Sequence, residues 1–67
     1  MSQQKLNTKR TESIRRILDT ATEIFSESGF EGARVDEIAR QAGVNKATIY
    51  YHIGDKEALY ARVIHDL

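Results

Sequence analysis

The sequence predicts an all-α domain of four helices. Apolar residues recur at three- and four-residue spacing, all four glycines fall between the periodic segments, and the chain has no proline. With 67 residues and 40% hydrophobic content, the chain is long enough for one small core, which supplies roughly 3 to 5 kcal/mol of stability.

The first predicted helix ends at Ser28. Gly29 is suited to a left-handed cap after it, and Phe30 is expected to fold back as the hydrophobic residue that follows the cap. The apolar stripe of this helix consists of Ile14, Ile17, Leu18, Ala21, Ile24 and Phe25.

Two short helices on either side of Gly43, over about residues 34–53, are the most informative part of the chain. The first has an apolar face of Val35, Ile38, Ala39 and Ala42. Asn45 is expected to cap the second helix by accepting a hydrogen bond from the amide of Ala47 or Thr48. Five apolar residues are predicted to anchor the pair to the core: Ile38, Ala39, Val44, Ile49 and Ile53. The pattern indicates a helix-turn-helix, which makes double-stranded DNA the first partner to consider.

A fourth helix is predicted after Asp55, which is expected to act as its N-cap. Its apolar stripe comprises Leu59, Tyr60, Val63, Ile64 and Leu67. The stripe is still running at Leu67, so we expect either a packing partner or, preferably, a longer protein of which this is the first part.

The outer face of the second short helix follows from about 100° of rotation per residue. If Ile49 and Ile53 point inward, then Ala47, Tyr50 and Tyr51 lie on the far side, with Lys46 and Thr48 on the flanks. Hydroxyl groups suit phosphate oxygens, a lysine reaches phosphate or a guanine edge, and an alanine methyl can meet a thymine methyl. The alternative for either tyrosine is that it only covers the edge of the core or is simply exposed.

The charge is unevenly distributed although the formal net charge is zero. Residues 1–16 hold five basic residues against Glu12 alone, so residues 1–10 are expected to form a basic, flexible arm that follows the minor groove or nearby phosphates. An exposed terminus without a role is the alternative. Residues 38–56 are mildly basic, with Arg40, Lys46 and Lys56 against Asp55. A solvated surface is the plainer explanation of either bias.

Several classes of protein are disfavoured. The chain lacks cysteine, a segment of roughly 20 apolar residues and a signal peptide, so we expect a cytoplasmic protein without a membrane span. His52 and His65 have no nucleophile or carboxylate cluster at a recognisable spacing. We therefore predict no enzyme activity, no catalytic residue, no cofactor and no metal site.

The run from Ala42 to Ile53, followed by Gly54-Asp55-Lys56-Glu57-Ala58-Leu59, resembles the N-terminal DNA-binding domain of the tetracycline-repressor (TetR) family of transcriptional regulators. The resemblance covers about residues 10–65. It implies a four-helix, homeodomain-like helix-turn-helix domain over residues 11–67, with a three-helix core and the start of a connecting fourth helix.

The resemblance also implies roles for individual residues. The helix over about residues 46–52 would enter the major groove, where Lys46 and Ala47, and also Tyr51, approach base edges. The residues expected to contact phosphate are Arg34, Thr48, Tyr50, Tyr51, His52 and Lys56. His52 has an alternative role as a hydrogen-bonded packing residue. The free amides at the starts of the second and fourth helices would favour an anion.

Three positions depart from the family pattern. Ala33 stands where a threonine or serine usually caps the second helix, Ala47 replaces a common glycine, and Ile53 replaces a common phenylalanine. These departures put the second helix start, the base preference and the filling of the core in question.

Family members continue into a C-terminal domain that binds a small-molecule inducer and dimerises, and this domain is absent from the 67 residues. The expected function is sequence-specific binding of a pseudo-palindromic operator by a homodimeric regulator, which represses rather than activates. The alternative is a helical protein–protein interaction module that does not bind DNA. The salt dependence of binding to duplex DNA distinguishes the two.

Overall fold

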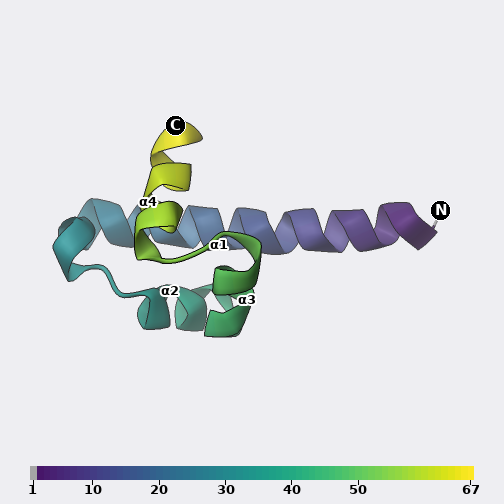
Figure 1. The fold of residues 1–67 in the computed structure, drawn as a ribbon, viewed down its shortest axis with the longest axis horizontal. Helices are drawn as coiled ribbons and strands as arrows, with labels where there is room; N and C mark the ends of the chain where they lie inside the picture. Colours follow the sequence, from purple (N-terminus) through teal and green to yellow (C-terminus); the bar gives the residue numbers. More distant parts are fainter. Residues whose placement is uncertain (1) are drawn as a thin grey trace.

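The computed structural model confirms an all-helical domain (Figure 1). It describes the backbone of residues 2–67 and the side chains of residues 10–67. Four helices follow one another: α1 (Ser2–Gly32), α2 (Val35–Ala42), α3 (Lys46–His52) and α4 (Lys56–His65). Apart from Arg10, the side chains of the predicted arm lie outside the described residues, so its role stays a prediction.

Helix α1 is interrupted at Gly29, whose φ of 74° and ψ of 173° are not helical. The break falls where the sequence predicts it, although this ψ differs from that of a left-handed cap, which is about 47°. A further turn follows, in which the Ala33 amide donates to the Gly29 carbonyl at 3.1 Å. Phe30 folds back as predicted, and its ring centroid lies 6.2 Å from that of Phe25.

The core forms where α1 meets α2 and α4. Helix α1 packs against both α2 and α4, whereas α3 packs against α2. In Figure 1, α2 and α3 lie below the long α1 and α4 crosses it. The buried apolar residues come from every helix and from the connection before α2: Ile17, Ala21, Ile24, Phe25, Ala33, Val35, Ile38, Ala39, Ala42, Ile49, Leu59 and Val63.

Helix α4 buries only part of its predicted apolar stripe. Leu59 and Val63 are buried and Tyr60 is partly buried, but Ile64 and Leu67 are exposed. The free end of α4 points away from α2 and α3 in Figure 1. None of the helices in residues 2–67 combines the length and the hydropathy needed to cross a membrane.

Candidate nucleic-acid interface

The turn between α2 and α3 is built around Gly43, which has the left-handed angles φ 74° and ψ 31°. The Val44 amide donates to the Ala39 carbonyl at 3.0 Å, and the Gly43 amide to the Arg40 carbonyl at 3.2 Å. These two bonds form a Schellman motif, which satisfies the carbonyl groups at the end of α2. The motif turns the chain back so that α3 packs against α2.

Helix α3 is held at its start and in its middle. The Asn45 side chain accepts a hydrogen bond from the Ala47 amide at 2.8 Å, as predicted. Ile49 is completely buried, while Val44 and Ile53 are partly buried and pack against the same core. Val44 and Ile53 therefore help Ile49 to hold the inward side of α3 against the core.

The opposite side of α3 faces solvent. Lys46, Ala47, Tyr50 and Tyr51 are exposed, and 85% of the Tyr51 surface is accessible. Thr48 is half-buried on the flank. Half of the side chains that are predicted to contact DNA thus lie on one accessible face of α3.

His52 ends α3 and is half-buried. Its ring lies beside that of Tyr51, with centroids 5.0 Å apart and an interplanar angle of 76°. This edge-to-face geometry is favourable for aromatic pairs. His52 therefore packs against the exposed Tyr51 ring, and its contact with phosphate stays a prediction.

Lys46 is paired with Asp36 across the two helices. The Lys46 Nζ lies 2.7 Å from the Asp36 Oδ1, and both side chains are at least half exposed. A hydrogen bond and the positive charge of Lys46 hold the pKa of Asp36 below its ordinary value, and the same pair raises the pKa of Lys46. Asp36 could not be identified from the sequence, because a contact between residues ten positions apart on two helices has no signature in helical periodicity.

Helix α2 starts without a side-chain cap. Its N-cap residue is Arg34, which has extended angles and makes no capping hydrogen bond, and the preceding Ala33 is 1% exposed. The cap position is therefore one residue later than the family pattern predicts. The exposed Arg34 guanidinium and the free amides of the first turn favour an anion at this helix start, whereas Asp36 and Glu37, which lie in the same turn, oppose one.

Lys56 is engaged within the protein. Its Nζ lies 4.5 Å from the centroid of the Phe30 ring and donates to the Glu31 carbonyl at 3.5 Å. Asp55 caps α4 as predicted by accepting a hydrogen bond from the Ala58 amide at 2.9 Å. The Asp55 carboxylate therefore occupies the start of α4 and opposes a further anion there, as Asp36 and Glu37 do in the first turn of α2.

A second acidic residue of α2, Glu37, is paired within its own helix. Its carboxylate accepts hydrogen bonds from the Arg40 guanidinium and, at 2.8 Å, from the Gln41 amide. The bond from Arg40, followed by that from Gln41, holds the pKa of Glu37 below its ordinary value. Arg40 therefore presents a partly neutralised charge beside the turn.

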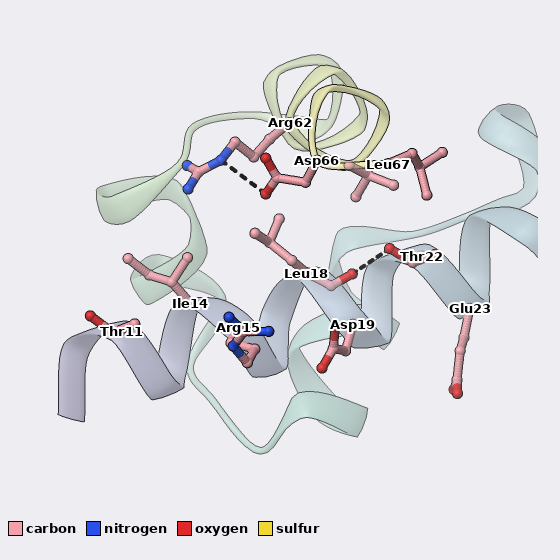
Figure 2. Close-up of a pocket in the computed structure, with 11 residues that line it drawn as sticks. Thr11, Ile14, Arg15, Leu18, Asp19, Thr22, Glu23, Arg62, Asp66 and Leu67 are labelled. Atoms are coloured by element: carbon pink, nitrogen blue, oxygen red, sulfur yellow. Dashed lines mark hydrogen bonds and ion pairs between the residues drawn. The ribbon is translucent and has the colours of Figure 1, made fainter. Parts of the chain in front are cut away.

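A groove between α1 and the end of α4 is separate from this surface (Figure 2). Ile14 and Leu18 point into it from α1, and Arg62 and Asp66 line the facing side, with the Arg62 Nε 3.4 Å from the Asp66 Oδ2. No group of three or more metal-binding side chains occurs among the described residues.

The fold and the exposed surface together define a helix-turn-helix domain in which α3, the second helix of the motif, is accessible. Residues 17–63 match the family model described as bacterial regulatory proteins, tetR family. The chain belongs to this family, which confirms the resemblance inferred from residues 42–59.

Several relatives share this domain. The chain is 35% identical over 51 residues to the biofilm operon icaADBC HTH-type negative transcriptional regulator IcaR of Staphylococcus epidermidis, covering 76% of this chain and 28% of that protein. It is 37% identical over 49 residues to IcaR of Staphylococcus aureus strain Newman, covering 73% and 26% of the two chains. These relatives are transcriptional regulators.

A solved structure is also similar, the crystal structure of a HlyIIR mutant protein with residues 170–185 substituted by alanine. It matches with a TM-score of 0.83 and 38% sequence identity over 85% of this chain and 32% of that one. The chain thus spans between about a quarter and a third of the length of the proteins that it matches.

Proposed function

We propose that this chain binds double-stranded DNA in a sequence-specific manner, as the DNA-binding domain of a transcriptional repressor. The observation that best supports this proposal is that α3 has two different sides. Ile49 on one side is fully buried, whereas the other side, which includes Tyr51, is exposed, polar and aromatic. A helix held in this way can enter the major groove without exposing its core. The name of IcaR, a negative regulator, favours repression over activation.

In this proposal one set of residues contacts base edges and another set contacts phosphates. Lys46, Ala47 and Tyr51 meet base edges, because they lie at the start of α3 and on its most exposed side. Arg34 binds phosphate together with the uncapped amides of α2. The remaining phosphate contacts come from groups around α3 and the start of α4: Thr48, Tyr50, Tyr51, His52 and Lys56.

The rest of the proposal concerns a longer protein. The matched regulators are more than twice as long as this chain, which supports a further domain. Family membership supports a homodimer that binds a pseudo-palindromic operator in the cytoplasm and responds to a small-molecule inducer. We assign it no enzyme activity.

Selection of bound duplexes from a random pool tests the proposal, followed by measurement of affinity for the selected and a scrambled duplex. We expect a preferred half-site and a binding constant that falls steeply with salt, with a log–log slope of about 0.9 per phosphate contact. Tyr51→Ala should weaken binding to the selected duplex about fivefold or more, since a good base contact contributes about 1 to 3 kcal/mol.

Ile64→Ala is the matched control, because Ile64 is also exposed but lies on α4 toward the end that points away from α3. It should leave DNA affinity unchanged. Absence of duplex binding even at low salt would contradict the proposal.

The exposed Ile64 and Leu67 favour the second candidate, a protein–protein interaction module. Tight, salt-insensitive association with a protein, together with no DNA binding, would support that module instead.

A further inference from the structure

The side chain of Lys46 is held by a residue on another helix. Its Nζ is 2.7 Å from the Asp36 carboxylate, with 50% of the Lys46 side chain and 61% of the Asp36 side chain accessible. Arg34 is close enough to contribute to the lowered pKa of Asp36. Asp36 thus lies near two cations, Lys46 at the start of α3 and Arg34 at the start of α2.

We infer that Asp36 increases the selectivity of DNA recognition by competing with phosphate oxygens for the Lys46 ammonium. This inference rests on the proposed function and assigns a role to a residue that makes no favourable contact with DNA itself. Asp36 is a specificity-determining residue that acts through Lys46.

The physical basis is an exchange of acceptors. When Lys46 binds a phosphate in an arbitrary duplex, it loses the Asp36 carboxylate, so one anion replaces another and the net gain is small. A guanine edge offers two acceptors, O6 and N7, in a fixed geometry, which compensates for the lost pair. An exposed pair is also weak enough for such an edge to displace it.

The same carboxylate opposes non-specific binding over a longer range. A negative charge at the protein–DNA interface reduces the number of counterions that binding releases, whatever the base sequence. Asp36 therefore lowers the affinity for every duplex, but a duplex that presents the correct acceptors to Lys46 recovers the loss.

Glu37 provides the matched control, because it is the next residue on α2 and carries the same charge. Its carboxylate binds Arg40 and Gln41 on its own helix and no residue of α3. Glu37→Gln removes one negative charge without releasing Lys46, whereas Asp36→Asn removes the charge and releases it.

The test measures the affinity of the chain for a selected and a scrambled duplex by fluorescence anisotropy over a range of salt concentrations. Relative to Glu37→Gln, Asp36→Asn should bind the scrambled duplex about threefold more tightly, with a log–log salt slope steeper by about 0.9, equivalent to one additional phosphate contact. Affinity for the selected duplex should change less than about twofold, so selectivity falls.

A double variant separates release of Lys46 from simple loss of charge. In a Lys46→Ala background, Asp36→Asn should have no larger effect than Glu37→Gln. An Asp36→Asn effect equal to that of Glu37→Gln, or one that persists in full without Lys46, would overturn the inference.

Thermal unfolding of each variant shows whether the Asp36–Lys46 pair contributes only to stability. A lower Tm for Asp36→Asn with unchanged selectivity would also overturn the inference. In both cases DNA binding itself remains, so the proposed function stands. Failure of the unsubstituted chain to bind any duplex at low salt would instead overturn the proposed function, and this inference with it.

Discussion

Gly54 lies so close to Ala58 that a β-carbon at position 54 would come within 2.9 Å of the Ala58 β-carbon. The Gly54 amide donates to the Ile49 carbonyl at 3.1 Å, and its φ is 132°. This contact joins the end of α3 directly to the first turn of α4. The absence of a side chain at position 54 therefore allows the end of α3 to pack closely against the first turn of α4.

Gly54→Ala should lower the free energy of unfolding by about 2 to 4 kcal/mol, because it adds a steric overlap to an unfavourable backbone conformation. Gly43→Ala is the matched comparison, since position 43 has φ 74° but no atom within 4 Å of an added β-carbon. Its expected cost is about 1 to 2 kcal/mol, from the backbone alone. Urea unfolding of both variants measures the difference, and equal losses would show that the contact with Ala58 is unimportant.

Arg34→Ser should separate stability from DNA binding. Arg34 has N-cap geometry without a capping bond, so a serine there should accept one and stabilise the domain by about 1 kcal/mol. The lost guanidinium should weaken binding to all duplexes and reduce the salt slope by about one. Arg34→Ala removes the charge without adding a cap. If Arg34→Ser is no more stable than Arg34→Ala, the start of α2 is already satisfied.

Lys46→Ala and Lys56→Ala should differ in their effect on sequence preference. Lys46→Ala should weaken the selected duplex about 5- to 150-fold and relax the preference at one base pair if Lys46 contacts a guanine. Lys56→Ala should weaken all duplexes alike and reduce the salt slope by about one. Affinities for selected and scrambled duplexes measure both effects, and equal losses on the two duplexes for Lys46→Ala would remove it from the base-contacting set.

Lys56→Ala has a second consequence, which its position over Phe30 makes clear. Loss of the cation–π contact should reduce the free energy of unfolding by about 0.5 to 1 kcal/mol. Unfolding of the variant must therefore be measured beside its DNA affinity.

Stability should fall in acid because the folded state lowers the pKa of Asp36 and Glu37. A carboxyl group with a lowered folded pKa contributes stability above its unfolded pKa, about 3.9 for aspartate and 4.3 for glutamate, and loses it as the pH falls through the folded value. The urea midpoint should therefore decrease below about pH 4.5. The double variant Asp36→Asn/Glu37→Gln should lose less stability over this range, and parallel curves for the two proteins would contradict the assignment.

Local features were predictable residue by residue. Asn45 and Asp55 cap α3 and α4 as the sequence indicates, and the chain breaks at Gly29 and Gly43. Each of these features depends on groups within a few positions of one another, so spacing and residue type suffice to predict it. The family resemblance rests on the same local pattern.

Contacts between helices were not predictable in this way. The Asp36–Lys46 pair and the position of Lys56 over Phe30 join residues from different elements. Helical periodicity says which face of a helix turns inward but not which residues of two helices meet. The exposure of Ile64 was also not predictable, because its place in the apolar stripe does not show whether another helix packs against it.

Local hydrogen bonding and hydrophobic spacing were enough to predict four helices, the N-caps of α3 and α4, and the inward and outward faces of α3. The three-dimensional packing was needed to show that Lys46 pairs with Asp36, that Lys56 lies over Phe30 and that position 54 has no room for a side chain. These relationships depend on how the helices cross, which is set by the packing of the whole core.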